Sequence, residues 1–406
     1  MIKTGFMLNA LALSVFSFAL AAPTQAQPTQ TYHIVGASSS TVANNVTKTV
    51  TTVQVGSNPL NRFLMTRVRK DIPDHALKGT VLLLPPLASG FQNYEVGDGG
   101  DYKRSFAGFL TRRNYDVWGY SQRTQGLAAG SCESGVVDCS VMADWGLQTI
   151  LDDVAFIRQQ IEAAHPGEKP VVGGLSLGSI ASLATINAHP NEYAGAILID
   201  GTIYDEDPFV RNINANFCSV FNDLLAGGAY YDGQGTPGAK LISHLAQMDP
   251  TGLSPIPGFP PGFTNHQAFV AALSSPQVSP VTPRPGFYQL AGSIAEDRFF
   301  FANESLVHDN ISGFVDYVAN RTVRDINCGL AGEQTFTANL HNFTGPVLIF
   351  AAGNGFGSGM IDTANLMTSA TVTLNFRGDY GHVDYVFSND HLHELERPVL
   401  KWLKKL

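Results

Sequence analysis

Short continuous apolar runs recur along the first half of the chain and return near its end. Bounded by glycine, proline or polar residues, such runs predict strands that are buried on both faces. They lie at residues 80–84, 115–120, 171–174, 195–200, 346–351 and 370–376. Apolar residues at three- and four-residue steps predict helices at residues 147–165, 177–188 and, last in the chain, near 391–403. This alternation predicts an α/β fold whose mostly parallel sheet is flanked by helices.

The N-terminal part has a different pattern. Residues 47–55 and 62–69 alternate in polarity or are rich in β-branched residues, and 56–59 has the composition of a turn. We therefore expect an opening pair of strands. Residues 27–45 are rich in Thr, Ser, Gln and Asn, and here we expect a loose lead-in.

The strand–helix rhythm stops between residues 202 and 342. This segment is rich in Pro, Gly and Phe, and only a few helical pieces are expected in it, such as 266–273 and 313–323. The simplest partition is an α/β core formed by residues 27–201 and 343–406, with 202–342 inserted as a large cap over the carboxyl ends of the strands. The aromatic residues of this segment either line a pocket for an apolar substrate or form the cap's own core. They include Phe259, Phe263, Phe269, Phe287, Tyr288, Phe299, Phe300 and Phe301.

A glycine-flanked serine follows the strand at 171–174. Gly174-Leu-Ser-Leu-Gly178 matches G-x-S-x-G, in which a nucleophilic serine sits on a sharp turn between a strand and a helix. The glycines carry no Cβ atoms that would collide where strand and helix approach each other. The pattern is weak alone, but the apolar strand and helix around it supply the context it requires. We predict Ser176 as the nucleophile and the Leu177 N–H as one donor to an oxyanion.

The order of strand, elbow serine, insertion, two strands and then Gly381-His382 resembles the α/β-hydrolase fold. Residues 114–125 are similar to the fourth-strand motif of its acid-lipase-like branch, and residues 380–386 resemble that branch's histidine motif. The resemblance implies the chain order Ser, acid, His, with His382 as the base that takes the serine proton.

Pro85-Pro-Leu-Ala-Ser89 departs from the family pattern. It stands where the family usually has a His-Gly-x turn. Because its two prolines have no N–H, the second oxyanion donor would be Leu87.

The acid of the triad stays open at the level of sequence. Most members of the fold carry it after the strand at 346–351, where the first carboxylate is Asp362, in a position expected to open a helix. A minority carry it one strand earlier, where Asp200 ends a strand, although an Asp-Gly pair there often only makes a turn. We favour Asp200 and keep Asp362, Asp205 and Asp207 as alternatives.

Residues 1–26 have the pattern of a signal peptide. Lys3 is followed by an apolar run over 7–22 and by small residues at candidate cleavage positions. The run is short for a membrane span, and no stop-transfer sequence follows it. We expect a secreted or periplasmic protein with no stable membrane span.

Four cysteines are expected to form disulfides in an exported protein, and they allow three connectivities. Cys132 and Cys139 are close in sequence and form the natural pair, which leaves Cys218 and Cys328. No spacing indicates a metal site, and we expect no cofactor. Five N-x-S/T sequons would matter only in a source that glycosylates: Asn45, Asn303, Asn310, Asn320 and Asn342.

The charge pattern excludes nucleic acid as a partner, because only 15% of the residues are charged, the net charge is −9 and no Lys/Arg run occurs. We predict a secreted serine hydrolase, esterase- or lipase-like, that cleaves an apolar small-molecule ester. Alternatives are a lactonase or serine peptidase with the same machinery, or a non-catalytic secreted binding module. The oligomeric state stays open.

Overall fold

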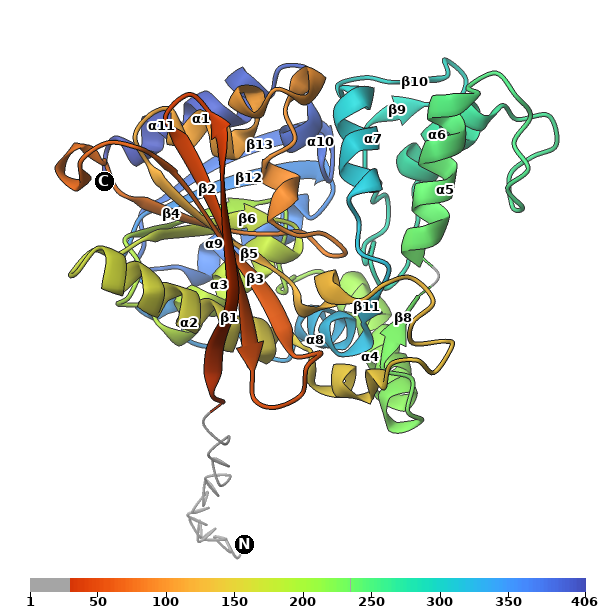
Figure 1. Ribbon diagram of the computed structural model, residues 1–406. Coiled ribbons are helices and arrows are strands. Elements are labelled where there is room, and N and C mark those ends of the chain that lie inside the picture. The colour runs from red at the N-terminus through yellow and green to blue at the C-terminus, as the bar shows by residue number, and fades with distance from the viewer. Residues whose placement is uncertain (1–29, 234) are drawn as a thin grey trace, which may run out of the picture. The chain divides into compact units, whose positions relative to one another are not determined.

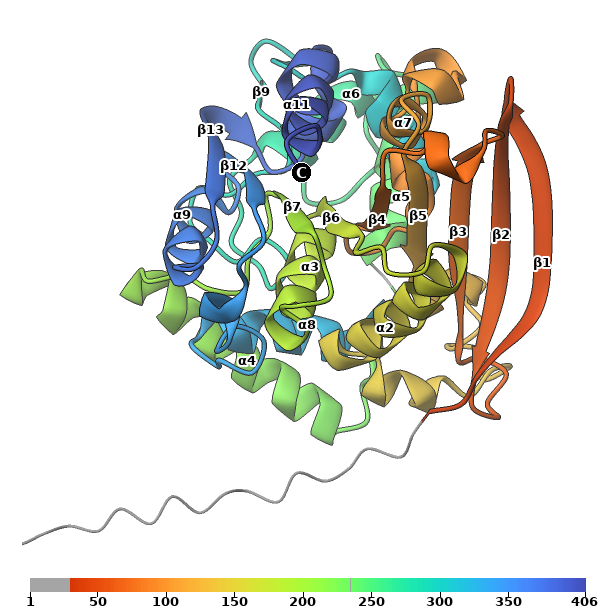
Figure 2. The same cartoon turned by 90° about the vertical axis from the view of Figure 1, so that its left-hand side faces the viewer.

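A nine-stranded sheet organises the residues described by the computed structural model, which are 30–233 and 235–406. The predicted signal peptide lies outside them. The strand order is β1-β2-β3-β5-β4-β6-β7-β12-β13 (Figure 2). Pairings from β1 to β5 are antiparallel and those from β5 to β13 parallel. The strands are β1 Tyr32–Ala43, β2 Val46–Val55, β3 Arg62–Lys70, β4 Thr80–Leu84, β5 Asp116–Ser121, β6 Val171–Leu175, β7 Gly195–Ile199, β12 Val347–Asn354 and β13 Val372–Gly381.

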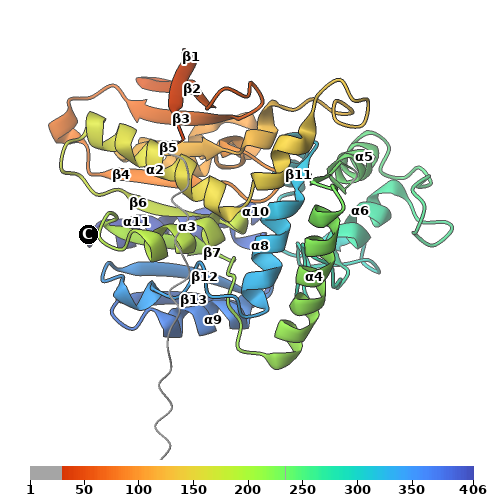
Figure 3. The same cartoon turned by 90° about the horizontal axis from the view of Figure 1, so that it is seen from below.

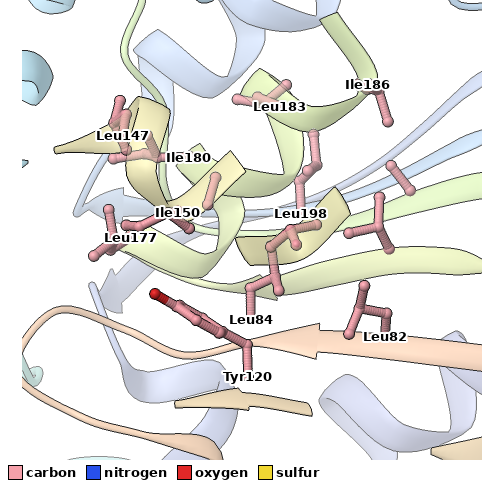
Figure 4. Packing of buried hydrophobic residues seen from close by; sticks show 14 of the residues in the cluster. Leu82, Leu84, Tyr120, Leu147, Ile150, Leu177, Ile180, Leu183, Ile186 and Leu198 are labelled. Atoms are coloured by element: carbon pink, nitrogen blue, oxygen red, sulfur yellow. The ribbon is translucent and has the colours of Figure 1, made fainter. Parts of the chain in front are cut away.

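Helices cover both faces of this sheet because the central strands are apolar on both sides. In β4, Leu82 and Leu84 belong to one buried cluster, and Val81 and Leu83 belong to another. Helices α2 (Leu147–Ala164) and α3 (Leu177–Ala188) pack on the first face. Helices α1 (Phe106–Thr111) and α11 (Arg397–Leu403) lie on the second (Figure 1). Figure 4 shows the first cluster, in which leucines of the strands meet Ile180, Leu183 and Ile186 of α3.

The expected strands and helices of the core agree with these elements to within a few residues, with one exception. Residues 27–45 were expected to be a loose lead-in, and this is wrong, because Tyr32–Ala43 forms β1 and pairs with β2 along its length. Most of its side chains are exposed. A strand held by backbone hydrogen bonds, without a buried face, has no hydrophobic period that a sequence could reveal.

The segment between β7 and β12 is more regular than its composition indicates. Its described residues form five α-helices, a short 3-10 helix at Leu340–Asn342 and two short strand pairs, β8 with β11 and β9 with β10. The helix expected at 266–273 is present as α6. The helix expected at 313–323 is wrong, since β11 lies within that range and α8 begins only at Asn320. The elements are α4 Pro208–Ala226, β8 Tyr231–Asp232, α5 Gly235–Met248, α6 Asn265–Ser274, β9 Gly292–Ser293, β10 Arg298–Phe299, α7 Glu304–Ser312, β11 Val318–Ala319 and α8 Asn320–Leu330.

Both expected disulfides are present. Cys132 and Cys139 close a short loop between β5 and α2. Cys218 of α4 is bonded to Cys328 of α8, and these two helices run side by side (Figure 3). Within residues 30–233 and 235–406, no helix combines the length and apolar character that crossing a bilayer requires.

Candidate active site

Ser176 occupies the turn between β6 and α3. Its backbone has φ 57° and ψ −119°, a conformation that is rare and strained for a residue with a side chain. The Ser176 N–H donates to Ile199 O at 2.9 Å. A Cβ atom on Gly174 or Gly178 would lie 2.1 or 1.8 Å from Leu84 O, so neither position admits a side chain. The sharp turn therefore depends on both glycines.

His382 follows β13 and lies between Ser176 and Asp200. Its Nε2 is 2.8 Å from Ser176 Oγ, and its Nδ1 is 2.7 Å from Asp200 Oδ2. The imidazole packs against the rings of Phe287 and Phe356, whose centroids lie 5.0 and 5.4 Å from its own and 5.4 Å from each other. Only 4% of His382 is exposed, so these contacts fix the orientation of the ring and keep bulk water away from it.

Asp200 is completely buried at the end of β7. Its Oδ1 accepts a hydrogen bond from Ala352 N at 2.8 Å, and its Oδ2 accepts one from Phe356 N at 3.1 Å in addition to the His382 contact. These contacts fix the position of the carboxylate beside the imidazole. Gly355 lies in the loop between β12 and α9 (Gly357–Leu366). A Cβ atom at this position would lie 2.0 Å from Asp200 Oδ2, so the loop can approach the carboxylate this closely only with glycine there.

The other candidate acids have different partners. Asp362 Oδ2 accepts a hydrogen bond from Glu206 N at 2.9 Å. Asp362 was expected to open a helix, and this is wrong, because α9 begins at Gly357 and Asp362 lies in its interior. Asp207 caps α4, and Asp205 forms a buried ion pair with Arg284.

The two predicted oxyanion donors, Leu87 and Leu177, line the same cavity as Ser176 and His382. Leu177 is the first residue of α3, so its N–H has no acceptor within the helix. Leu87 follows the two prolines after β4 and precedes Ala88, whose φ of 60° lies in the left-handed region. Both N–H groups are thus on segments with unusual backbone geometry beside the serine.

The cavity has a volume of about 350 Å³ and is predominantly apolar. Its walls come from the sheet side and from the segment 202–342, including Leu273, Val307, Ile311 and Phe314 of that segment. The aromatic residues singled out in the sequence are not among its lining. Phe269, Phe287 and Phe299 are instead buried in hydrophobic clusters.

Asp384 is a buried carboxyl group near the site that the sequence argument did not single out. Its Oδ2 accepts hydrogen bonds from Gly381 N at 2.6 Å and from Ala291 N at 2.9 Å. Burial raises the pKa of Asp384 to about 7, although the two N–H groups oppose this. The sequence feature that could have identified Asp384 is its position two residues after the predicted base His382, in Gly-His-Val-Asp. Asp384 ties the histidine loop to the segment 202–342.

One group of three side chains in the described residues has the spacing of metal ligands: Cys218, Cys328 and Glu333. Both sulfur atoms are held in the disulfide, so neither is a thiolate that could bind a metal ion.

Comparisons with known proteins identify the fold. The sequence matches no family model and no curated protein. Among solved structures, a protein of Sulfolobus solfataricus that is assigned as a lipase is similar with a TM-score of 0.60 and 19% identity, over 89% of this chain and 95% of that one. A thermostable carboxyl esterase from Bacillus coagulans is similar with a TM-score of 0.54 and 13% identity, over 88% and 98%. The chain therefore has the α/β-hydrolase fold, as its motifs indicated.

Proposed function

We propose that this chain is an exported serine hydrolase that cleaves carboxylic esters with an apolar acyl group. The observation that carries the proposal is the pair of hydrogen bonds linking Ser176 through His382 to Asp200, at the wall of an apolar cavity. The esterase and lipase among the similar structures support ester hydrolysis only through the shared fold.

In the acylation step, Ser176 Oγ attacks the ester carbonyl carbon while His382 Nε2 takes the hydroxyl proton. The carbonyl oxygen becomes an oxyanion, which the N–H groups of Leu87 and Leu177 stabilise. Collapse of the tetrahedral intermediate breaks the ester C–O bond. His382 gives its proton to the departing alkoxide, which leaves as an alcohol, and the acyl group stays on Ser176.

In the deacylation step, water attacks the acyl carbon and His382 takes the water proton. The second tetrahedral intermediate expels Ser176 Oγ, which recovers its proton from His382, and the carboxylic acid is released. Asp200 holds the imidazole with Nδ1 protonated and Nε2 facing the serine, and it stabilises the imidazolium that forms in both steps. The two further N–H donors to its carboxylate support this role.

The cavity supports a small substrate. Pockets for small molecules range over about 300–1,000 Å³, so a cavity of 350 Å³ is at the lower end. The apolar lining favours an aliphatic acyl chain of short to medium length. The two disulfides support an exported protein, because such bonds persist in oxidising compartments.

The test is hydrolysis of chromogenic esters of increasing acyl length by the mature protein and by Ser176→Ala. We expect the wild type to cleave the shorter esters and the variant to lose nearly all turnover while keeping its melting temperature. Ser182→Ala is the matched control, since it removes a buried hydroxyl from α3, the helix that follows Ser176, and should stay active. Failure to cleave any ester, together with no labelling of Ser176 by a serine-directed phosphonate, would overturn the proposal.

A further inference from the structure

The segment 202–342 could be a lid that opens on contact with a lipid surface or a roof that stays closed. Its contacts with the three loops around the proposed triad distinguish these possibilities. Each loop is joined to the segment by hydrogen bonds, and each junction includes at least one bond between backbone groups.

The loop that carries Leu87 is held from two sides. From the core, Gln122 Nε2 donates to Pro86 O at 2.9 Å and to Ser89 O at 3.2 Å. From the segment, Val315 N donates to Ala88 O at 2.8 Å. Ala88 has a positive φ, which costs free energy for a residue with a side chain and persists only where its surroundings impose it. The contact with Val315 is therefore suited to holding the peptide beside Leu87 in its present orientation.

A second hydrogen bond reinforces the same junction. Gln92 Nε2 donates to Gly313 O at 2.9 Å, two residues before Val315. Nearby, the amide of Asn310 in α7 donates to Asn93 Oδ1, and both side chains are at least nine-tenths buried. A buried hydrogen bond is stronger than one exposed to water, so separating α7 from this loop would exchange this pair for weaker bonds to solvent.

The histidine loop pairs with residues 288–291 of the segment. His382 N donates to Tyr288 O and Val383 N to Gln289 O, both at 2.9 Å. In the opposite direction, Ala291 N donates to Asp384 Oδ2 at 2.9 Å. Lifting the segment would pull directly on the backbone of His382.

The loop around Asp200 is the third junction. Tyr288 N donates to Asn354 O at 3.0 Å. The guanidinium group of Arg284 bonds to Phe356 O at 3.3 Å and also to Ser358 Oγ and Asp205. Since Phe356 N donates to Asp200 Oδ2, the same peptide region contacts both the segment and the proposed acid.

The cavity has lining residues that reach solvent without movement of the segment. Asp232, Gly235 and Val281 line the cavity and also have exposed surface, so the cavity wall extends to the outside of the protein at these residues. Movement of the segment as a lid, in contrast, would first have to break the three junctions.

We propose that residues 284–315 form a fixed roof that holds the Leu87 loop in its productive shape through Val315, so that the enzyme hydrolyses esters as single dissolved molecules and not as aggregated lipid. This inference rests on the proposed ester hydrolysis. It assigns Val315 and Gln92 as positioning residues, because neither acts on the substrate itself.

The first experiment measures the initial rate against the concentration of a short-chain triacylglycerol, from well below to well above its solubility limit. We expect hyperbolic saturation below the limit and no increase above it. A several-fold rise in rate at the limit would show that an interface opens the cavity, and it would overturn the roof while leaving ester hydrolysis intact. Absence of both turnover and phosphonate labelling would instead refute the proposed function.

The second experiment compares Val315→Pro, which lacks the donor N–H, with Val315→Ala, which keeps it. We expect Val315→Pro to lower kcat about 10- to 100-fold, below the 10²–10³ typical for complete loss of an oxyanion donor, with KM changed less than about threefold. Affinity for a boronic acid that mimics the tetrahedral intermediate should fall by a similar factor, while phosphonate still labels Ser176. Val315→Ala should remain close to the wild type.

If Val315→Pro does not fold, as judged by circular dichroism, Gln92→Met carries the test. It removes the side-chain donor to Gly313 O while keeping the size of the side chain. We expect kcat to fall about three- to tenfold with KM nearly unchanged. A wild-type kcat in the folded variant would refute the positioning role, because it is the result expected of a purely structural contact.

Discussion

The sheet and the segment 202–342 use apolar side chains differently. In the sheet, Leu82, Leu84 and Leu198 have no exposed surface and pack against helices. In the segment 202–342, Leu253 and Met248 are 73% and 69% exposed, and other apolar residues face the cavity. Apolar surface that meets other protein atoms stabilises the fold, whereas apolar surface left around a cavity is available to a ligand.

The two regions also contribute differently to the proposed chemistry. Ser176, His382 and Asp200 all follow strands of the sheet, where the backbone is rigid and extensively hydrogen-bonded. The segment 202–342 contributes the cavity walls and the contacts that orient the surrounding loops. We therefore expect changes at the proposed triad to lower the rate most and changes in the cavity walls to alter selectivity, whereas Val315 acts on the rate through the Leu87 loop.

The largest effect should come from Asp200→Asn. This change removes the negative charge that orients and stabilises the His382 imidazolium, and kcat should fall about 10²- to 10⁴-fold. Asp362→Asn is the matched control, because that carboxylate bonds to the backbone of Glu206 and should alter kcat little. If Asp362→Asn instead lowered kcat for ester hydrolysis strongly and Asp200→Asn did not, Asp362 would be the acid.

Removal of the two disulfides should affect stability unequally. Cys218 and Cys328 are 110 residues apart, whereas Cys132 and Cys139 are 7 apart. From loop-closure entropy, replacing both Cys218 and Cys328 by Ser should lower the free energy of unfolding by about 5 kcal/mol. Replacing both Cys132 and Cys139 by Ser should lower it by about 2 kcal/mol. Urea denaturation of both variants measures the difference. Equal losses would show that strain or unfolded-state structure outweighs loop length.

Asp384 should give the folded protein a distinctive pH dependence. Its pKa is raised from an ordinary value of 3.8 to about 7, mainly by burial. Between about pH 4 and pH 7 the folded protein retains this proton and the unfolded chain has lost it, so stability falls as the pH rises through this window. Asp384→Asn, which keeps an acceptor oxygen, should make the melting temperature less dependent on pH there. The exposed Asp390→Asn is the control, and an unchanged pH profile in Asp384→Asn would refute the prediction.

The smallest effect should come from filling the cavity. Ala239 of α5 lines it, so Ala239→Phe should reduce kcat/KM for longer acyl chains about tenfold relative to shorter ones. Leu241→Phe adds an aromatic ring to the same helix at an exposed position outside the lining and should leave the preference unchanged. The ratio of rates on two esters measures the effect, and identical ratios in the two variants would contradict the assigned walls.

The sequence alone predicted the α/β core because its signals are local. Leu82 and its neighbours form a short apolar run typical of a strand buried on both faces, and the glycines around Ser176 form a five-residue pattern that is visible in the sequence, although the contact that requires them is with Leu84 O of the neighbouring strand. The exposed strand β1 escaped prediction because backbone pairing with β2 holds it without an apolar face.

The choice of acid and the contacts of the segment 202–342 depended on tertiary structure. The sequence favoured Asp200 but left Asp362 open, and only the approach of β7 to the loop after β13 puts Asp200 within 2.7 Å of His382. Likewise, the Pro- and Gly-rich composition of 202–342 does not reveal the hydrogen bond from Val315 to Ala88, 227 positions earlier. Local patterns determine which residues form strands and turns, whereas contacts between distant residues depend on how the whole chain packs.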